Sequence, residues 1–217
     1  MFRVSNQHLS VSLDIVFDKP VPYDAVGLAI IATAALEQFA AYSLKPTGIS
    51  QNPGDQLFNY ELSFSLFNNQ AHFRLSSERL FVTIQNARTE ADVKTLIDAL
   101  IRVQQCFSSD KPCRTNFQAV AHAAFPNDND YSTFFAPFAD LTNDIIDGGR
   151  ILFVKEKDWP LKVRLAFERS IVFKNSVFIT WWTEQTGMVD LENFKKIPDK
   201  IGRSLQKAGL EINFGQT

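Results

Sequence analysis

Residues 9–17 read LSVSLDIVF, and every odd-numbered position in this stretch is apolar. Ser10, Ser12 and Asp14 stand between the apolar residues. Successive side chains of a β-strand point to opposite faces of its sheet, so this period of two places the apolar side chains together. The stretch predicts a half-buried strand with one face that needs a covering layer.

A helix is expected next in the chain, over residues 24–43. Asp24 is suited to the N-cap, because its carboxylate can accept hydrogen bonds from free backbone N–H groups. Apolar residues then recur at spacings of three and four, which is the period of a helix with one buried side. Pro46 and Gly48 end the helix, and the turn-forming residues 47–55 predict a loop.

Three short strands are expected after this loop, over residues 60–66, 71–75 and 80–84, because apolar side chains alternate in each. The turns between them are short, which favours antiparallel neighbours. A second helix is expected to open at Thr89 and to carry apolar residues as far as Phe107. The first half therefore reads β-α-β-β-β-α.

The second half is predicted to repeat this order. A strand is expected over residues 117–125, a helix over 131–147, and three strands over 151–155, 161–167 and 177–181. The last helical region runs from Asp190 to Gly209, and Pro198 delays its start or kinks it, because proline lacks the N–H donor.

Internal duplication is the preferred interpretation. Phe17 and Tyr23 are separated by the same six positions as Phe125 and Tyr131, each pair spanning a strand-to-helix turn. The predicted fold is α+β, a two-layer sandwich with two similar halves over residues 1–110 and 111–217 and with helices packed on one face of antiparallel sheet. The alternative is one continuous domain whose halves alternate in similar ways.

Composition narrows the class of protein. The chain has 217 residues, 20 of them Phe, and a net charge of −2, so a large core is expected and nucleic acid is disfavoured. No secretion signal or bilayer-spanning segment is expected, and Cys106 and Cys113 form no disulfide framework. A cytoplasmic location is the expectation.

The motifs of common active sites are missing from the sequence. There is no G-x-S-x-G elbow, no phosphate-binding glycine loop and no calcium loop. The three histidines lie far apart in the sequence, which does not suggest a metal site. Carboxylates on strands are expected to form cross-strand ion pairs, such as Glu61 with Arg74. No catalytic residue, metal or cofactor is therefore assigned.

Aromatic residues on the polar side of the strands are the more informative feature. Trp181 and Trp182 are adjacent, so one of them must leave the core face. Phe67 and Phe81 also fall among polar and basic neighbours, a mixture that is typical of binding surfaces. The candidate binding residues are Phe67, His72, Arg74, Phe81, Arg164 and Trp182.

Three functions are compatible with these patterns. The first is a non-enzymatic binding or adaptor protein, such as a chaperone or immunity-type protein, that holds another protein or a second copy on the exposed sheet face. The second is a small-molecule binder or enzyme with an aromatic-lined pocket between sheet and helices. The third is a duplicated saddle for nucleic acid, which requires one continuous basic face formed by Arg74, Arg79, Arg88, Lys162, Arg164, Arg169 and Lys174.

Overall fold

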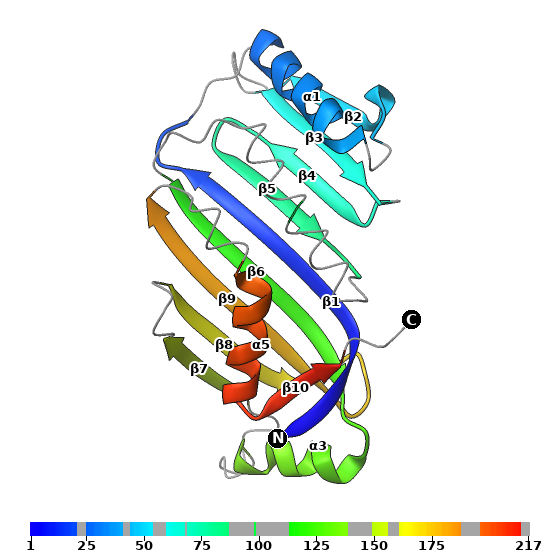
Figure 1. Ribbon diagram of the computed structural model, residues 1–217, viewed down its shortest axis with the longest axis vertical. Helices are drawn as coiled ribbons and strands as arrows, with labels where there is room; N and C mark the ends of the chain where they lie inside the picture. Colours follow the sequence, from blue (N-terminus) through cyan, green and yellow to red (C-terminus); the bar gives the residue numbers. More distant parts are fainter. Residues whose placement is uncertain are drawn as a thin grey trace.

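The computed structural model describes residues 1–20, 25–40, 44–53, 60–67, 69–86, 98, 113–138, 149–155, 161–187 and 196–213. They form one ten-stranded, mostly antiparallel sheet with α-helices, so the α+β class is confirmed (Figure 1). The strands are β1 (Phe2–Phe17), β2 (Ile49–Pro53), β3 (Tyr60–Leu66), β4 (Ala71–Leu75), β5 (Arg79–Ile84), β6 (Cys113–Ala124), β7 (Arg150–Lys155), β8 (Lys162–Arg169), β9 (Ser176–Gly187) and β10 (Leu210–Asn213). The helices are α1 (Ala25–Phe39), α3 (Asp128–Phe135) and α5 (Ile197–Lys207), with short 3-10 turns η2 (Pro46–Gly48) and η3 (Ala136–Phe138).

The strand order places β1, the longest strand, and its antiparallel partner β6 near the middle of the sheet. The order is β2-β3-β4-β5-β1-β6-β9-β8-β7, and β10 pairs in parallel with the start of β1. Along this order, the strands on the β5 side of the β1–β6 pair come from the first half of the sequence and those on the β9 side from the second. The exception is β10, which comes from the second half and pairs with β1 on the side opposite β6. In Figure 1, α1 and α5 lie over the same face of this sheet.

A bulge in β1 explains why its apolar period shifts. Asn6 pairs with Ala123 and His8 with His122, so Gln7 is one extra residue in β1. An extra residue moves all preceding side chains to the opposite face. Val4 is thereby buried on the same side as Leu9, although the two residues differ in parity.

The core lies on the face covered by the helices. Phe39 of α1 packs against Phe64 of β3 and Phe73 of β4, with ring centroids 5.7 and 5.5 Å apart. Phe64 and Phe73 are stacked on each other at 4.7 Å. Large aromatic areas are removed from water here, which is a main source of folding free energy. The predicted use of phenylalanine in the core is confirmed.

The expected strands agree closely with the structure in the first half, with two additions. β1 begins at Phe2 rather than at Leu9, and β2 occupies part of the expected loop over residues 47–55. The helix expected between Thr89 and Phe107 lies outside the described residues except for Asp98, which is helical. Tyr23, used in the comparison of the two halves, is also outside them.

The second half shows how local signals set the ends of its elements. Asn127 caps α3, because its side-chain oxygen accepts from the Asp130 backbone N–H at 2.8 Å. α5 begins at Ile197, with Pro198 in its first turn, a position that proline tolerates. Residues 190–195, where the helical region was expected to start, lie outside the described residues. Gly149 precedes β7, and a Cβ there would lie 2.7 Å from the Phe167 carbonyl oxygen.

Candidate functional site

The open face is defined here as the side of the sheet opposite α1 and α5. Alternate residues of each strand point to it, because the core-facing residues between them are buried. Its centre is made of small polar side chains from the β1–β6 pair, including Ser10 and Ser12 from β1 and Asn116 and Gln118 from β6. Aromatic and charged residues lie on the strands to either side.

The adjacent tryptophans divide between the two faces, as predicted. Trp181 is 1% exposed and packs edge-on against Phe117 on the core side, with ring centroids 5.7 Å apart. Trp182 is half-buried and points to the open face, where its register neighbours are Gln118 on β6 and Arg164 on β8. One indole therefore supports the core, and the other is partly accessible.

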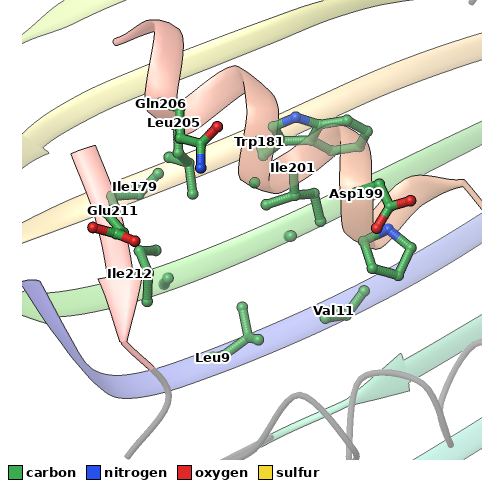
Figure 2. A pocket seen from close by; sticks show the side chains of 14 residues that line it. Leu9, Val11, Ile179, Trp181, Asp199, Ile201, Leu205, Gln206, Glu211 and Ile212 are labelled. Atoms are coloured by element: carbon green, nitrogen blue, oxygen red, sulfur yellow. The ribbon is translucent and has the colours of Figure 1, made fainter. Parts of the chain in front are cut away.

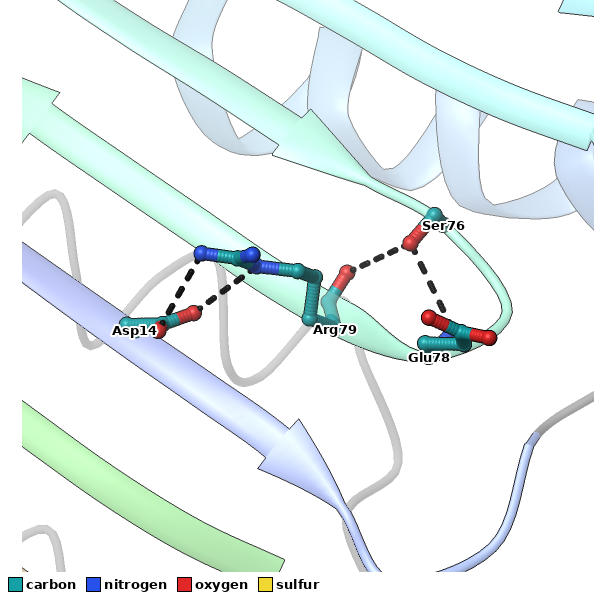
Figure 3. Close-up of polar contacts among 4 residues, drawn as sticks. All are labelled: Asp14, Ser76, Glu78 and Arg79. Atoms are coloured by element: carbon teal, nitrogen blue, oxygen red, sulfur yellow. Dashed lines mark hydrogen bonds and ion pairs between the residues drawn. The ribbon is translucent and has the colours of Figure 1, made fainter.

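On the first half, Phe81 is a partly accessible aromatic residue of the open face. It is half-buried on the open face of β5, between Asp14 on β1 and Arg74 on β4. The guanidinium of Arg79 lies 5.7 Å from the centroid of its ring. Arg79 also donates to both carboxylate oxygens of Asp14, at 3.1 and 3.2 Å (Figure 3). The ring is thus bordered by an ordered ion pair.

Arg74 and His72 continue this region on β4. Arg74 pairs with Glu61 of β3, which confirms the predicted cross-strand ion pair. His72 shares a hydrogen bond with Ser65, with 2.9 Å between Nδ1 and Oγ. Phe67 differs from the other candidates. Its own backbone φ is positive, at 52°, and its side chain packs against the core.

The six predicted residues therefore form two groups and one outlier. His72, Arg74 and Phe81 are neighbours on β4 and β5, and Arg164 and Trp182 are neighbours on β8 and β9. The strands β1 and β6 separate the two groups. From β5 to β9 there are three strand spacings, or roughly 14 Å. A partner that contacts both groups must therefore extend over roughly 14 Å.

A histidine cluster on the open face was missed at the sequence level. His8 and His122 lie opposite each other across β1 and β6, with ring centroids 6.1 Å apart. His122 also contacts the rings of Phe173 and Phe178, and its Nδ1 lies 2.9 Å from the Ser170 hydroxyl oxygen. Their distance in the sequence hid this contact, which only the antiparallel register creates.

This environment lowers the pKa of His122 from its ordinary value. Burial is the larger cause, because a buried imidazolium loses hydration, and the charge of nearby His8 acts in the same direction. The described residues include no group of three or more His, Cys, Asp or Glu side chains placed to hold a metal ion. The cluster therefore consists of contacts between imidazole and phenyl rings.

The basic residues expected for a nucleic-acid saddle do not share one face. Arg169 lies on the helix side, where its guanidinium covers the rings of Tyr131 and Phe135 at 5.4 and 5.1 Å. Arg74 and Arg79 lie on the open face but are paired with carboxylates. Arg88 is outside the described residues. The continuous basic surface that the saddle requires is interrupted at Arg169.

A cavity of about 270 Å³ lies on the opposite side of the sheet, under α5 (Figure 2). Its floor is apolar and includes Leu9, Val11 and Trp181, while Asp199 and Gln206 stand at its helical side. The buried alanines of β6, Ala119 and Ala121, leave room here because their side chains are short. This cavity lies between sheet and helix as expected, but its lining is mainly aliphatic, with Trp181 as its single aromatic residue, whereas an aromatic lining was expected.

None of the helices in the described ranges is long and apolar enough to cross a bilayer. Cys106 is outside these ranges, so the expectation for the two thiols is not addressed. No protein-family model matches the chain, and no curated protein matches its sequence.

Proposed function

We propose that the protein is a non-enzymatic binding module that holds another protein on the open face of its sheet. The observation that carries this proposal is the position of Phe81 and Trp182, which lie half-buried on either side of a polar centre without joining the core. Aromatic side chains in this state supply large contact areas at low entropic cost when a partner covers them.

The strand register supports internal duplication as part of the same proposal. Phe17 and Phe125 mark the ends of the first strand of each half, and they differ by 108 positions. The same offset matches Val11 on β1 with Ala119 on β6, which are themselves register partners. The central pair then brings two equivalent strands together about a local pseudo-twofold axis.

The neighbouring strands follow this match. Val11 pairs with Ile84 on β5, and its equivalent Ala119 pairs with Trp181 on β9. Ile84 is therefore the equivalent of Trp181. The four residues that precede each of them are LFVT (residues 80–83) and VFIT (residues 177–180). The second residue of each run is an open-face phenylalanine. A duplicated origin accounts for this correspondence more simply than independent alternation does.

The proposal thus gives the open face two equivalent aromatic positions, Phe81 and Phe178, one on each side of the β1–β6 pair. Phe178 contacts His122, and Phe81 contacts Arg79, so the two sites differ in their polar neighbours. A partner that contacts both sites would cover the small polar residues between them. A protein surface has the required size, since stable interfaces bury roughly 800 Å² on each side.

Capture of partners from the native cell tests this function. We expect tagged protein to retain a protein in stoichiometric amount, and the double substitution of Phe81→Ala and Trp182→Ala to reduce this recovery at least about tenfold. Ile30→Ala is the matched control, because Ile30 is 65% exposed on α1, away from the open face. Equal recovery by both variants would refute the proposed site.

The cavity under α5 supports a second candidate, binding of a small apolar molecule. Its volume of about 270 Å³ lies near the lower end for ligand pockets, which suggests a compact ligand. Native mass spectrometry of protein from its own cell should then reveal a bound mass that Ala121→Leu removes by filling the space. A wild-type spectrum without any added mass would count against this candidate.

A further inference from the structure

The outer edge of β7 is the feature that carries a further inference. Among the described strands, only β8 pairs with β7, which ends the strand order. At the other end of the sheet, β3 is covered by the short strand β2. An uncovered edge presents backbone N–H and C=O groups that another extended chain can pair with.

The side chains of β7 are unusual for an uncovered edge. Phe153 is 76% exposed and Ile151 is 51% exposed, and both point to the open face. Leu152 and Val154 are half-buried on the core side. The strand is therefore apolar on both faces over residues 151–154, with charged residues only at its two ends and no proline, so its middle lacks the features that usually protect an edge from pairing.

Positive charges frame this apolar strand. Arg150 and Lys155 are its first and last residues, and Lys162 and Arg164 lie on β8 beside Lys155 and Phe153. None of the four forms an ion pair with a carboxylate of the described residues. The surroundings of the free edge thus favour negative charge at both ends of an added strand.

We propose that β7 is a strand-addition site for an extended segment of a partner protein, with apolar residues at its centre and carboxylates at its ends. This inference rests on the proposed protein-binding function and names the mode and chemistry of one contact. Backbone hydrogen bonds along β7 supply affinity, and Phe153 with the flanking cations selects the segment. A second copy of the chain fits less well, because full antiparallel overlap places Arg150 opposite Lys155.

Synthetic peptides test the proposal directly. The probe is a capped, fluorescent peptide of alternating valine and threonine with two glutamates at each end, and its control carries lysines in place of the glutamates. We expect the acidic peptide to bind at least roughly tenfold more tightly, since several charge pairs change sign. The double variant Arg150→Glu with Lys155→Glu should reverse this preference, and Phe153→Thr should weaken both peptides.

Hydrogen exchange identifies the mode of binding. Addition of the acidic peptide should slow exchange of backbone amides in residues 150–155, whereas docking on the open face would leave edge amides unchanged. The proposal fails if the two peptides bind alike, if neither binds up to about 1 mM, or if these amides stay unprotected. Phe81→Ala should reduce partner capture and retain peptide binding. Failure of the open-face proposal is therefore read from partner capture, and failure of the edge site from the peptides.

Discussion

The two faces of the sheet differ in how their aromatic residues are used. On the helix side, Trp181 and Phe117 meet in a close edge-on contact and are almost fully buried. On the open face, Trp182 lies one residue away in the sequence and remains half-buried among polar neighbours. The strand period alone separates these roles. Adjacent residues can therefore contribute to stability in one case and be available for recognition in the other.

The largest contrast is expected between alanine substitutions of the two tryptophans. Trp181→Ala should lower the free energy of unfolding by about 3–5 kcal/mol, because it opens a cavity in the core. Trp182→Ala should lower it by about 1 kcal/mol or less. Urea denaturation of both variants measures the difference, and similar losses would mean that the two faces are equally packed.

Deletion of Gln7 tests whether the bulge determines which face of the sheet the residues before it point to. Without the extra residue, Phe2 and Val4 would turn toward the open face and lose their core contacts. Burial of these side chains predicts a loss of about 2–4 kcal/mol in unfolding free energy. Gln7→Ala keeps the residue count and should remain close to wild type. A deletion variant as stable as wild type would contradict the assigned register.

The histidine cluster predicts a pH dependence on the open face. Because the pKa of His122 is lowered in the folded protein, the unfolded chain binds more protons as the pH falls through about 6.5. The free energy of unfolding should therefore fall below this pH, and His122 adds no further change once the folded state is also protonated.

Urea denaturation between about pH 8 and pH 5 measures this slope. His122→Gln should make the slope shallower, and His8→Gln should do so only in part, because it removes the smaller of the two causes. An unchanged slope in His122→Gln would assign the pH dependence to other groups.

The smallest effect is expected at the Asp14–Arg79 ion pair. Its two hydrogen bonds are well formed, yet both side chains are partly exposed, at 23% and 51%. Exposed pairs contribute about 0.2–1 kcal/mol, so Asp14→Asn should alter stability within that range. A double-mutant cycle with Arg79→Gln isolates the pair. A coupling energy well above this range would mean that the open face contributes substantially to stability, contrary to the contrast between the two faces of the sheet.

Sequence patterns predicted the parts of the fold that local chemistry controls. Alternation in residues 9–17 acts within a few residues and agrees with β1. The helix expected from Tyr131 begins about one turn earlier, at Asp128, where Asn127 caps it. β2 was missed because only Ile49 among its five residues has a strong strand preference, whereas Asn52 and Pro53 are typical of turns, and its pairing with β3 has no local signal.

The candidate site was predicted less completely, for a related reason. The open-face positions of Phe81 and Trp182 follow from strand parity, which a sequence reveals. The contact of His8 with His122 depends on register between strands that lie far apart in the chain, and the cavity under α5 depends on the packing of three separate elements. Neither of these long-range relations has a local signal.

Oxidative footprinting of the captured complex tests the central claim most directly. In the free protein, hydroxyl radicals should modify Phe81, Trp182 and the exposed Ile30. In the complex, the account predicts protection of Phe81 and Trp182, with Ile30 modified as before. Unchanged modification of Phe81 and Trp182, with protection confined to the α5 side of the sheet, would contradict the open face as the binding surface.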